Sequence, residues 1–260
     1  MKVELQTAKN IANLVRKEFP YESPYLLHRY ELNKFLTSNK NNSDYWDKQK
    51  SFLKKDHALN MVRASYGDIK KSAFEYFKEL IKAVHKYKVQ NCGESARITY
   101  AVSRINQIDE SHLRPAFLIE SEEKDYSKSL FPEVDKMFDK MREQEYGYDG
   151  KRLDHIATQI VLDDGSKVIL DSNIDKCEEI HKMEKVYKDN FGDIFGIDKN
   201  KKLQIIEGDY LVAGIPTLND KDAFKLANLY PELILEQNHL DPPKRKYFFI
   251  DLFSLFNKNC

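Results

Sequence analysis

The order of helical and strand-like patterns constrains the fold of this chain most. Helical spacing of apolar residues marks four stretches in its first half: 4–18, Ser43 towards Val62, 68–87 and 92–106. Two strand-like runs follow later, at 153–162 and 167–171. The 9 glycines and 8 prolines are few for 260 residues, which favours long helices over a many-turned β-sandwich. We therefore expect a helix-rich α+β fold with a small antiparallel sheet.

The expected elements divide the chain into two regions. Residues 1–87 are expected to form a helical N-terminal region, and residues 88–260 a core with a C-terminal helical extension, although one continuous domain is the alternative. Further elements complete the prediction: strands near 113–119 and 203–207, and helices over 132–143, 177–190 and 221–229. The functions of residues 1–87 and 177–260 stay open at this point.

Charge and cysteine content exclude several classes of partner. Lys+Arg and Asp+Glu are each 42, so there is no global attraction for nucleic acid, and no nucleic-acid partner is expected. The three cysteines show neither a disulfide framework nor zinc-ligand spacing, so no metal is expected and a reducing cytoplasm is favoured. Neither a signal core nor a run of about 18 apolar residues is present, so no membrane span is expected.

Cys92 stands where a polar run enters an amphipathic helix. A thiolate there faces unpaired backbone N–H groups and the positive end of the helix dipole, which favour its ionised form. The same N–H groups can stabilise an oxyanion, with Gln90 or Asn91 as side-chain donors, and Gly93 leaves room for a substrate. The alternative is an incidental cysteine in a helix start capped by Asn91 and Glu94.

His155 belongs to the first of the two strand-like runs. Ile156 and Ile160 share the face that resembles core, whereas His155 and Ala157 share the other face. The small side chain of Ala157 should leave space on that face for a partner such as the cysteine helix. A half-buried strand histidine without a chemical role is the alternative.

The loop between the two runs decides where Asp171 points. A three-residue loop over 163–165, with Gly165 left-handed, pairs His155 with Asn173 and places Asp171 diagonally on the face of His155. A two-residue turn would put Asp171 on the opposite face. In the first register Asp171 can orient the imidazole, with Asn173 as the alternative orienting residue. Asp171 could instead simply start the turn that follows the strand.

The order of these three residues resembles that in the papain-like and transglutaminase-like superfamily. A cysteine opens a helix, a histidine follows on a strand, and an acid stands at the end of the next strand. The matching segments are Asn91-Cys92-Gly93-Glu94, Asp154-His155-Ile156-Ala157 and Val168-Ile169-Leu170-Asp171. The resemblance implies a thiolate at Cys92, a general base and acid at His155, an orienting acid at Asp171 and an acyl-enzyme intermediate. It covers residues 88 to 175 and implies no cofactor.

The expected function is therefore a thiol-dependent hydrolase that acts on an amide bond of a protein substrate, as a protease or a glutamine deamidase. Two alternatives remain open: an acyltransferase or transglutaminase on the same fold, and a non-catalytic binding protein that retains it. Many compact members of the superfamily are bacterial effectors. The composition resembles theirs, so the substrate could be a host protein, reached through secretion that is independent of a signal peptide.

Overall fold

The computed structural model describes eight stretches of the chain: residues 2–19, 43–67, 71–120, 153–172, 174, 176–191, 203–210 and 213–235. The helix expected over 132–143, the alternative orienting residue Asn173 and the cysteine at position 260 lie outside these described residues.

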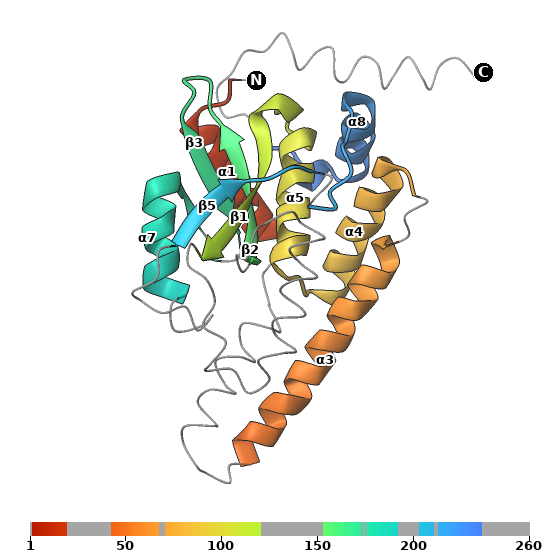
Figure 1. The fold of residues 1–260 in the computed structure, drawn as a ribbon. Helices are drawn as coiled ribbons and strands as arrows, with labels where there is room; N and C mark the ends of the chain where they lie inside the picture. The colour runs from red at the N-terminus through yellow and green to blue at the C-terminus, as the bar shows by residue number, and fades with distance from the viewer. Residues whose placement is uncertain are drawn as a thin grey trace, which may run out of the picture.

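A five-stranded antiparallel sheet lies at the centre of the fold, and Figure 1 labels four of its strands, β1, β2, β3 and β5. The strand order in this sheet is β4-β3-β2-β1-β5. Its strands are β1 (Leu113–Glu120), β2 (Leu153–Val161), β3 (Lys167–Asp171), β4 (Lys176–Glu179) and β5 (Leu203–Glu207). Every neighbouring pair is antiparallel. Together with the helices, this sheet confirms the expected α+β class.

In the described ranges, six α-helices accompany the sheet: α1 (Leu5–Glu18), α3 (Ser43–Tyr66), α4 (Ala73–Tyr87), α5 (Cys92–Ile105), α7 (Ile180–Phe191) and α8 (Asp220–Leu229). Two short 3₁₀ helices, η1 (Glu110–His112) and η3 (Pro231–Leu233), complete the described elements. Local sequence explains where helices begin and end. In α4, for example, Ser72 and Glu75 form a capping box and Lys88 ends the helix in a left-handed conformation.

The helix expected over 177–190 begins later than predicted. Residues 176–179 form the edge strand β4, in which Cys177 pairs with Leu170 of β3, and α7 starts only at Ile180. Pairing with β3 satisfies the backbone groups of this segment, and such tertiary pairing overrides the local helical pattern.

The two faces of the sheet pack against different helices. Thr158 and Ile160 of β2 face α5, because the Thr158 hydroxyl donates to the carbonyl of Ala96 at 3.0 Å and Ile160 shares a core with the apolar residues of α5. Ala157 and Ile169 belong to a second cluster with Met183 of α7. Figure 1 shows the sheet between α7 and α5.

The cysteine helix therefore does not cover the face of Ala157, as expected from the sequence, but the opposite one. The apolar residues of α5 need a large apolar surface, and Ile160 with Val168 and Leu170 provides it. Ala157 instead makes room for α7.

One large core joins the helical layer to the sheet. It contains Ile11 of α1, Leu80 of α4, Ile98 of α5 and Leu226 of α8. The division into residues 1–87 and 88–260 stays a prediction, since the apolar residues of both parts share this core. Across the described ranges, no helix combines the length and the apolar character that crossing a bilayer requires.

Candidate active site

The helix α5 begins at Cys92, as the sequence predicts. Asn91 is its N-cap, and Glu94 closes a capping box with it, in which the Asn91 backbone N–H donates to Oε2 of Glu94 at 3.1 Å. The N–H groups in the first turn of an α-helix have no intrahelical acceptor. The Cys92 thiol therefore lies at the positive end of α5, and its side chain is partly exposed. The capping box at this helix start therefore does not exclude a reactive cysteine at position 92.

Glu94 also anchors the start of α5 to α3. Its Oε1 accepts hydrogen bonds from Nε of Arg63 at 3.0 Å and from the hydroxyl of Tyr66 at 2.7 Å, and its side chain is 2% exposed. Burial alone would raise the pKa of Glu94, but the Arg63 guanidinium and these hydrogen bonds hold it below its usual value. The carboxylate thus stays charged and keeps the Cys92 turn in place.

The hairpin of β2 and β3 has the register expected for the three-residue loop, and not that of the two-residue turn. Gly165 is left-handed with φ of 83°, and the ladder runs from Val161–Lys167 to Thr158–Leu170. Beyond Thr158, β2 no longer pairs with β3 but continues to pair with β1 through His155 and, after a register shift, to Leu153. His155 and Asp171 therefore come together at the point where the β2–β3 ladder ends.

His155 joins Cys92 to Asp171. Its Nε2 lies 2.5 Å from Oδ2 of Asp171, with side-chain exposures of 3% and 0%. The Cys92 side chain is a further polar neighbour of the imidazole, and its proximity contributes to the raised pKa of His155. The structure thus brings together the three residues that the sequence proposes as catalytic.

The imidazole of His155 favours its protonated form. Burial alone would lower its pKa, but the Asp171 charge and the hydrogen bonds to Asp171 and Cys92 outweigh burial and raise the pKa to about 10. At neutral pH, His155 therefore retains a proton that it accepts from the Cys92 thiol. This is the electrostatic condition for a thiolate–imidazolium pair.

Two contacts dock the start of α5 onto the sheet. The hydroxyls of Ser95 and Ser172 hydrogen-bond each other in the interior. Ser95 lies one turn after Cys92, and Ser172 directly follows Asp171, so this contact ties the nucleophile helix to the strand end that carries the acid. Thr158 makes the second contact, with the carbonyl of Ala96.

Tyr187 of α7 belongs to the site although the sequence did not indicate it. Its hydroxyl donates to Oδ2 of Asp171 at 2.7 Å, and its ring meets the His155 ring edge-on at a centroid distance of 5.5 Å. The only signal in the sequence is helical spacing from Met183, which equally fits a core tyrosine. Burial and the Asp171 charge raise the pKa of Tyr187 well above its usual value, so its hydroxyl remains a donor.

The expected substrate-binding residues differ in their placement. Asn91 and Gly93 are partly exposed beside Cys92. A Cβ at Gly93 would come within 2.8 Å of Nη1 of Arg97, so only glycine fits there without a shift of that guanidinium. Gln90 is fully buried, and its Nε2 donates to the carbonyl of Phe19 at 3.1 Å, so this amide serves the packing of α1.

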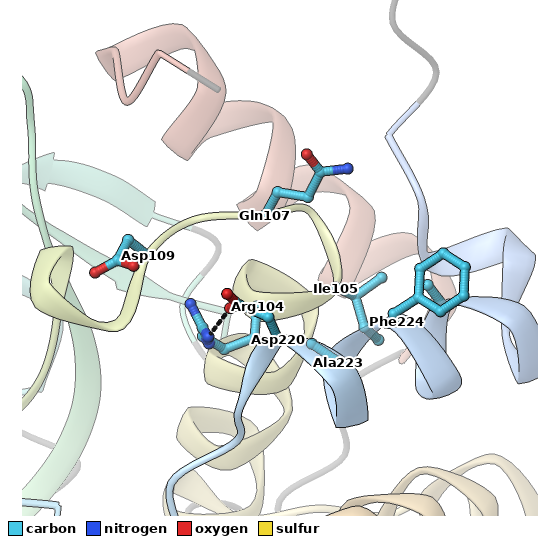
Figure 2. Close-up of a pocket in the computed structure, with 8 residues that line it drawn as sticks. Arg104, Ile105, Gln107, Asp109, Asp220, Ala223 and Phe224 are labelled. Atoms are coloured by element: carbon cyan, nitrogen blue, oxygen red, sulfur yellow. Dashed lines mark hydrogen bonds and ion pairs between the residues drawn. The ribbon is translucent and has the colours of Figure 1, made fainter. Parts of the chain in front are cut away.

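A cavity of about 330 Å³ lies at the opposite end of α5 (Figure 2). Figure 2 shows Arg104 paired with Asp220 beside it, and Phe224 at its rim. The Arg104 guanidinium also donates to the carbonyls of Leu218 and Ile108, so its donors are already engaged. Because α5 separates this cavity from Cys92, we do not assign it to the candidate active site.

Side chains that could hold a metal do not gather in the described ranges: no group of three His, Cys, Asp or Glu residues there is arranged around a common point. Comparison of the chain with protein-family models, with curated proteins and with solved structures gave no match.

Proposed function

We propose that the protein is a thiol-dependent hydrolase of the papain-like or transglutaminase-like type, which acts on an amide bond of a protein substrate. The observation that carries the proposal is the hydrogen bond of 2.5 Å between His155 and Asp171, with Cys92 beside the imidazole at the start of α5. A cysteine at a helix start, a buried strand histidine and a buried carboxylate are each common. Their direct contact in one place supports nucleophilic catalysis.

The first half of the reaction forms an acyl-enzyme. His155 takes the Sγ proton of Cys92, and the thiolate attacks the carbonyl carbon of the substrate amide to form a C–S bond. The backbone N–H groups of Cys92 and Gly93, at the open start of α5, are suited to hold the resulting oxyanion. The tetrahedral intermediate then collapses, the C–N bond breaks, and His155 gives its proton to the departing amine.

Water completes the reaction in the second half. His155 accepts a proton from the attacking water, the C–S bond breaks, and the acid leaves while the proton returns to Cys92. Asp171 keeps Nε2 of His155 in place throughout and stabilises the imidazolium. Hydrolysis of a peptide bond and of a glutamine amide follow the same steps, so the protein surface around Cys92 must decide between them.

Comparison of the wild type with Cys92→Ser in cell lysates tests the proposal. A eukaryotic and a bacterial lysate are each incubated with either protein, and mass spectrometry then counts new protein N-termini and glutamine residues converted to glutamate. A protease produces new N-termini, and a deamidase produces new glutamates, in both cases only with wild type.

Glu75→Gln is a suitable control in this assay, because Glu75 is an exposed carboxylate of α4. It should act on the lysates as the wild type does. Products that form equally with Cys92→Ser would contradict the proposal, and so would a complete lack of wild-type products in both lysates.

A further inference from the structure

Tyr187 places a second hydrogen-bond donor on the carboxylate oxygen that His155 uses. The Tyr187 hydroxyl lies 2.7 Å and Nε2 of His155 2.5 Å from the same Oδ2 of Asp171. Tyr187 is 1% exposed, so water does not compete for this bond. Asp171 is thus held from β2 on one side and from α7 on the other.

Two donors on one oxygen influence each other. A hydrogen bond to a carboxylate stabilises its negative charge and reduces its attraction for a second donor. This effect is largest when His155 is neutral, because an imidazolium already neutralises much of the carboxylate charge. The Tyr187 hydroxyl therefore stabilises the state with neutral His155 more than the state with imidazolium.

We propose that Tyr187 is a positioning residue of the active site, which fixes Asp171 and weakens the hold of that carboxylate on the imidazolium of His155. The inference rests on the proposed function, since it concerns how that site releases a proton. His155 must both accept a proton from Cys92 and return it to the leaving amine. An imidazolium held too tightly by Asp171 would perform the second step slowly.

Few other charged groups face this pair within the described part of the chain. Cys92 approaches from α5, and exposed Lys176 lies opposite Asp171 in the β3–β4 ladder. Glu184, one turn before Tyr187, is engaged by the backbone N–H of Ile205 at 3.1 Å. Tyr187 thus links α7 directly to Asp171.

Titration of His155 by NMR tests the inference on the full-length chain with ¹³C-labelled histidine. The reference protein and the Tyr187→Phe variant both carry Cys92→Ala, which removes a side chain that itself raises the His155 pKa. The His155 signal is assigned by its loss in His155→Gln. Tyr187→Phe should raise the His155 pKa by roughly half a unit to one unit, since it removes a charge-assisted hydrogen bond that favours the neutral imidazole.

A second variant reverses the expected sign. Replacement of Tyr187 by 3-fluorotyrosine makes the phenol a stronger donor, so it should lower the His155 pKa. It also keeps the test decisive if Tyr187→Phe fails to fold. Tyr100→Phe is the matched control, because Tyr100 is equally buried but its hydroxyl binds the backbone N–H of Leu218 at 2.9 Å. It should leave the His155 pKa unchanged.

A purely structural role for Tyr187 would alter thermal stability without moving the His155 titration, and that result would overturn the inference. The same holds if both Tyr187 variants shift the pKa in one direction. Because the titration uses a protein without the nucleophile, its failure leaves the proposed hydrolase untouched. Failure of the lysate experiment would refute the hydrolase whatever the titration shows.

Discussion

Asp171→Asn isolates the role of the carboxylate with little change in side-chain shape. The asparagine retains one oxygen that can accept from His155 or Tyr187, but it carries no charge. In the wild type, burial lowers the His155 pKa, but the Asp171 charge, with smaller contributions from the hydrogen bond to Asp171 and from Cys92, raises it from 6.5 to about 10. Without that charge, burial should dominate.

The expected result is a His155 pKa below 6.5 in the variant, against about 10 in the wild type. Each pKa unit changes the equilibrium between imidazolium and neutral imidazole tenfold, or about 1.4 kcal/mol. The variant should therefore disfavour the imidazolium by a factor on the order of a thousand relative to the wild type. Because the thiolate of Cys92 depends on this imidazolium, its alkylation near pH 7 should slow by roughly a hundredfold or more.

Histidine NMR measures the pKa, and alkylation by iodoacetamide with mass spectrometry measures the rate at Cys92. Asp164→Asn is the control, because Asp164 lies in the exposed β2–β3 loop and interacts with Ser166. It should change neither quantity. A His155 pKa that stays near 10 in Asp171→Asn would refute the reasoning, since contacts other than the Asp171 charge would then have to outweigh burial.

Three further predictions concern stability. The wild type should be more stable than Asp171→Asn, and this difference in the free energy of unfolding should be greatest below pH 6.5, where His155 is protonated in both the folded and the unfolded wild type. The difference should shrink as the pH rises to about 10; urea unfolding at several pH values measures it, and a difference that grows with pH would contradict the prediction. Glu94→Gln should destabilise the protein by about 2 kcal/mol, because it removes a buried charge paired with Arg63. Glu75→Gln, in the exposed capping box of α4, should cost less than about 1 kcal/mol; equal effects of the two variants in urea unfolding would contradict the role of Glu94 in anchoring α5 to α3. Gly165→Ala should destabilise by about 1 kcal/mol, because its φ is 83° while a Cβ there would meet nothing within 4 Å; a neutral substitution in thermal unfolding would disprove the backbone strain.

Local rules explain why much of the candidate site was predictable from the sequence. The Asn91–Glu94 capping pattern marked the start of α5 at Cys92. The three-residue loop with Gly165 fixed the strand register, and the register places Asp171 diagonally from His155. Each of these relations spans few residues, so propensity and hydrogen bonding within the segment decide it.

Long-range packing explains what the sequence did not indicate. The helix α5 packs on the sheet face that carries Thr158 because β3 as well as β2 contributes apolar area there. The edge strand β4 forms because β3 offers backbone partners, although its residues suit a helix start. Tyr187 reaches Asp171 only after α7 has packed on the sheet, and no local pattern distinguishes it from a core tyrosine.

The pH dependence of iodoacetamide alkylation in the wild type and in His155→Ala tests the thiolate–imidazolium pair most directly. Cys177 provides an internal reference in the same protein, because burial raises its pKa to about 11 and keeps it a thiol near neutral pH. We predict that Cys92 reacts far faster than Cys177 at pH 6 to 7 and loses this advantage in His155→Ala. A Cys92 that is no more reactive than Cys177, or whose reactivity is unchanged without His155, would contradict the account.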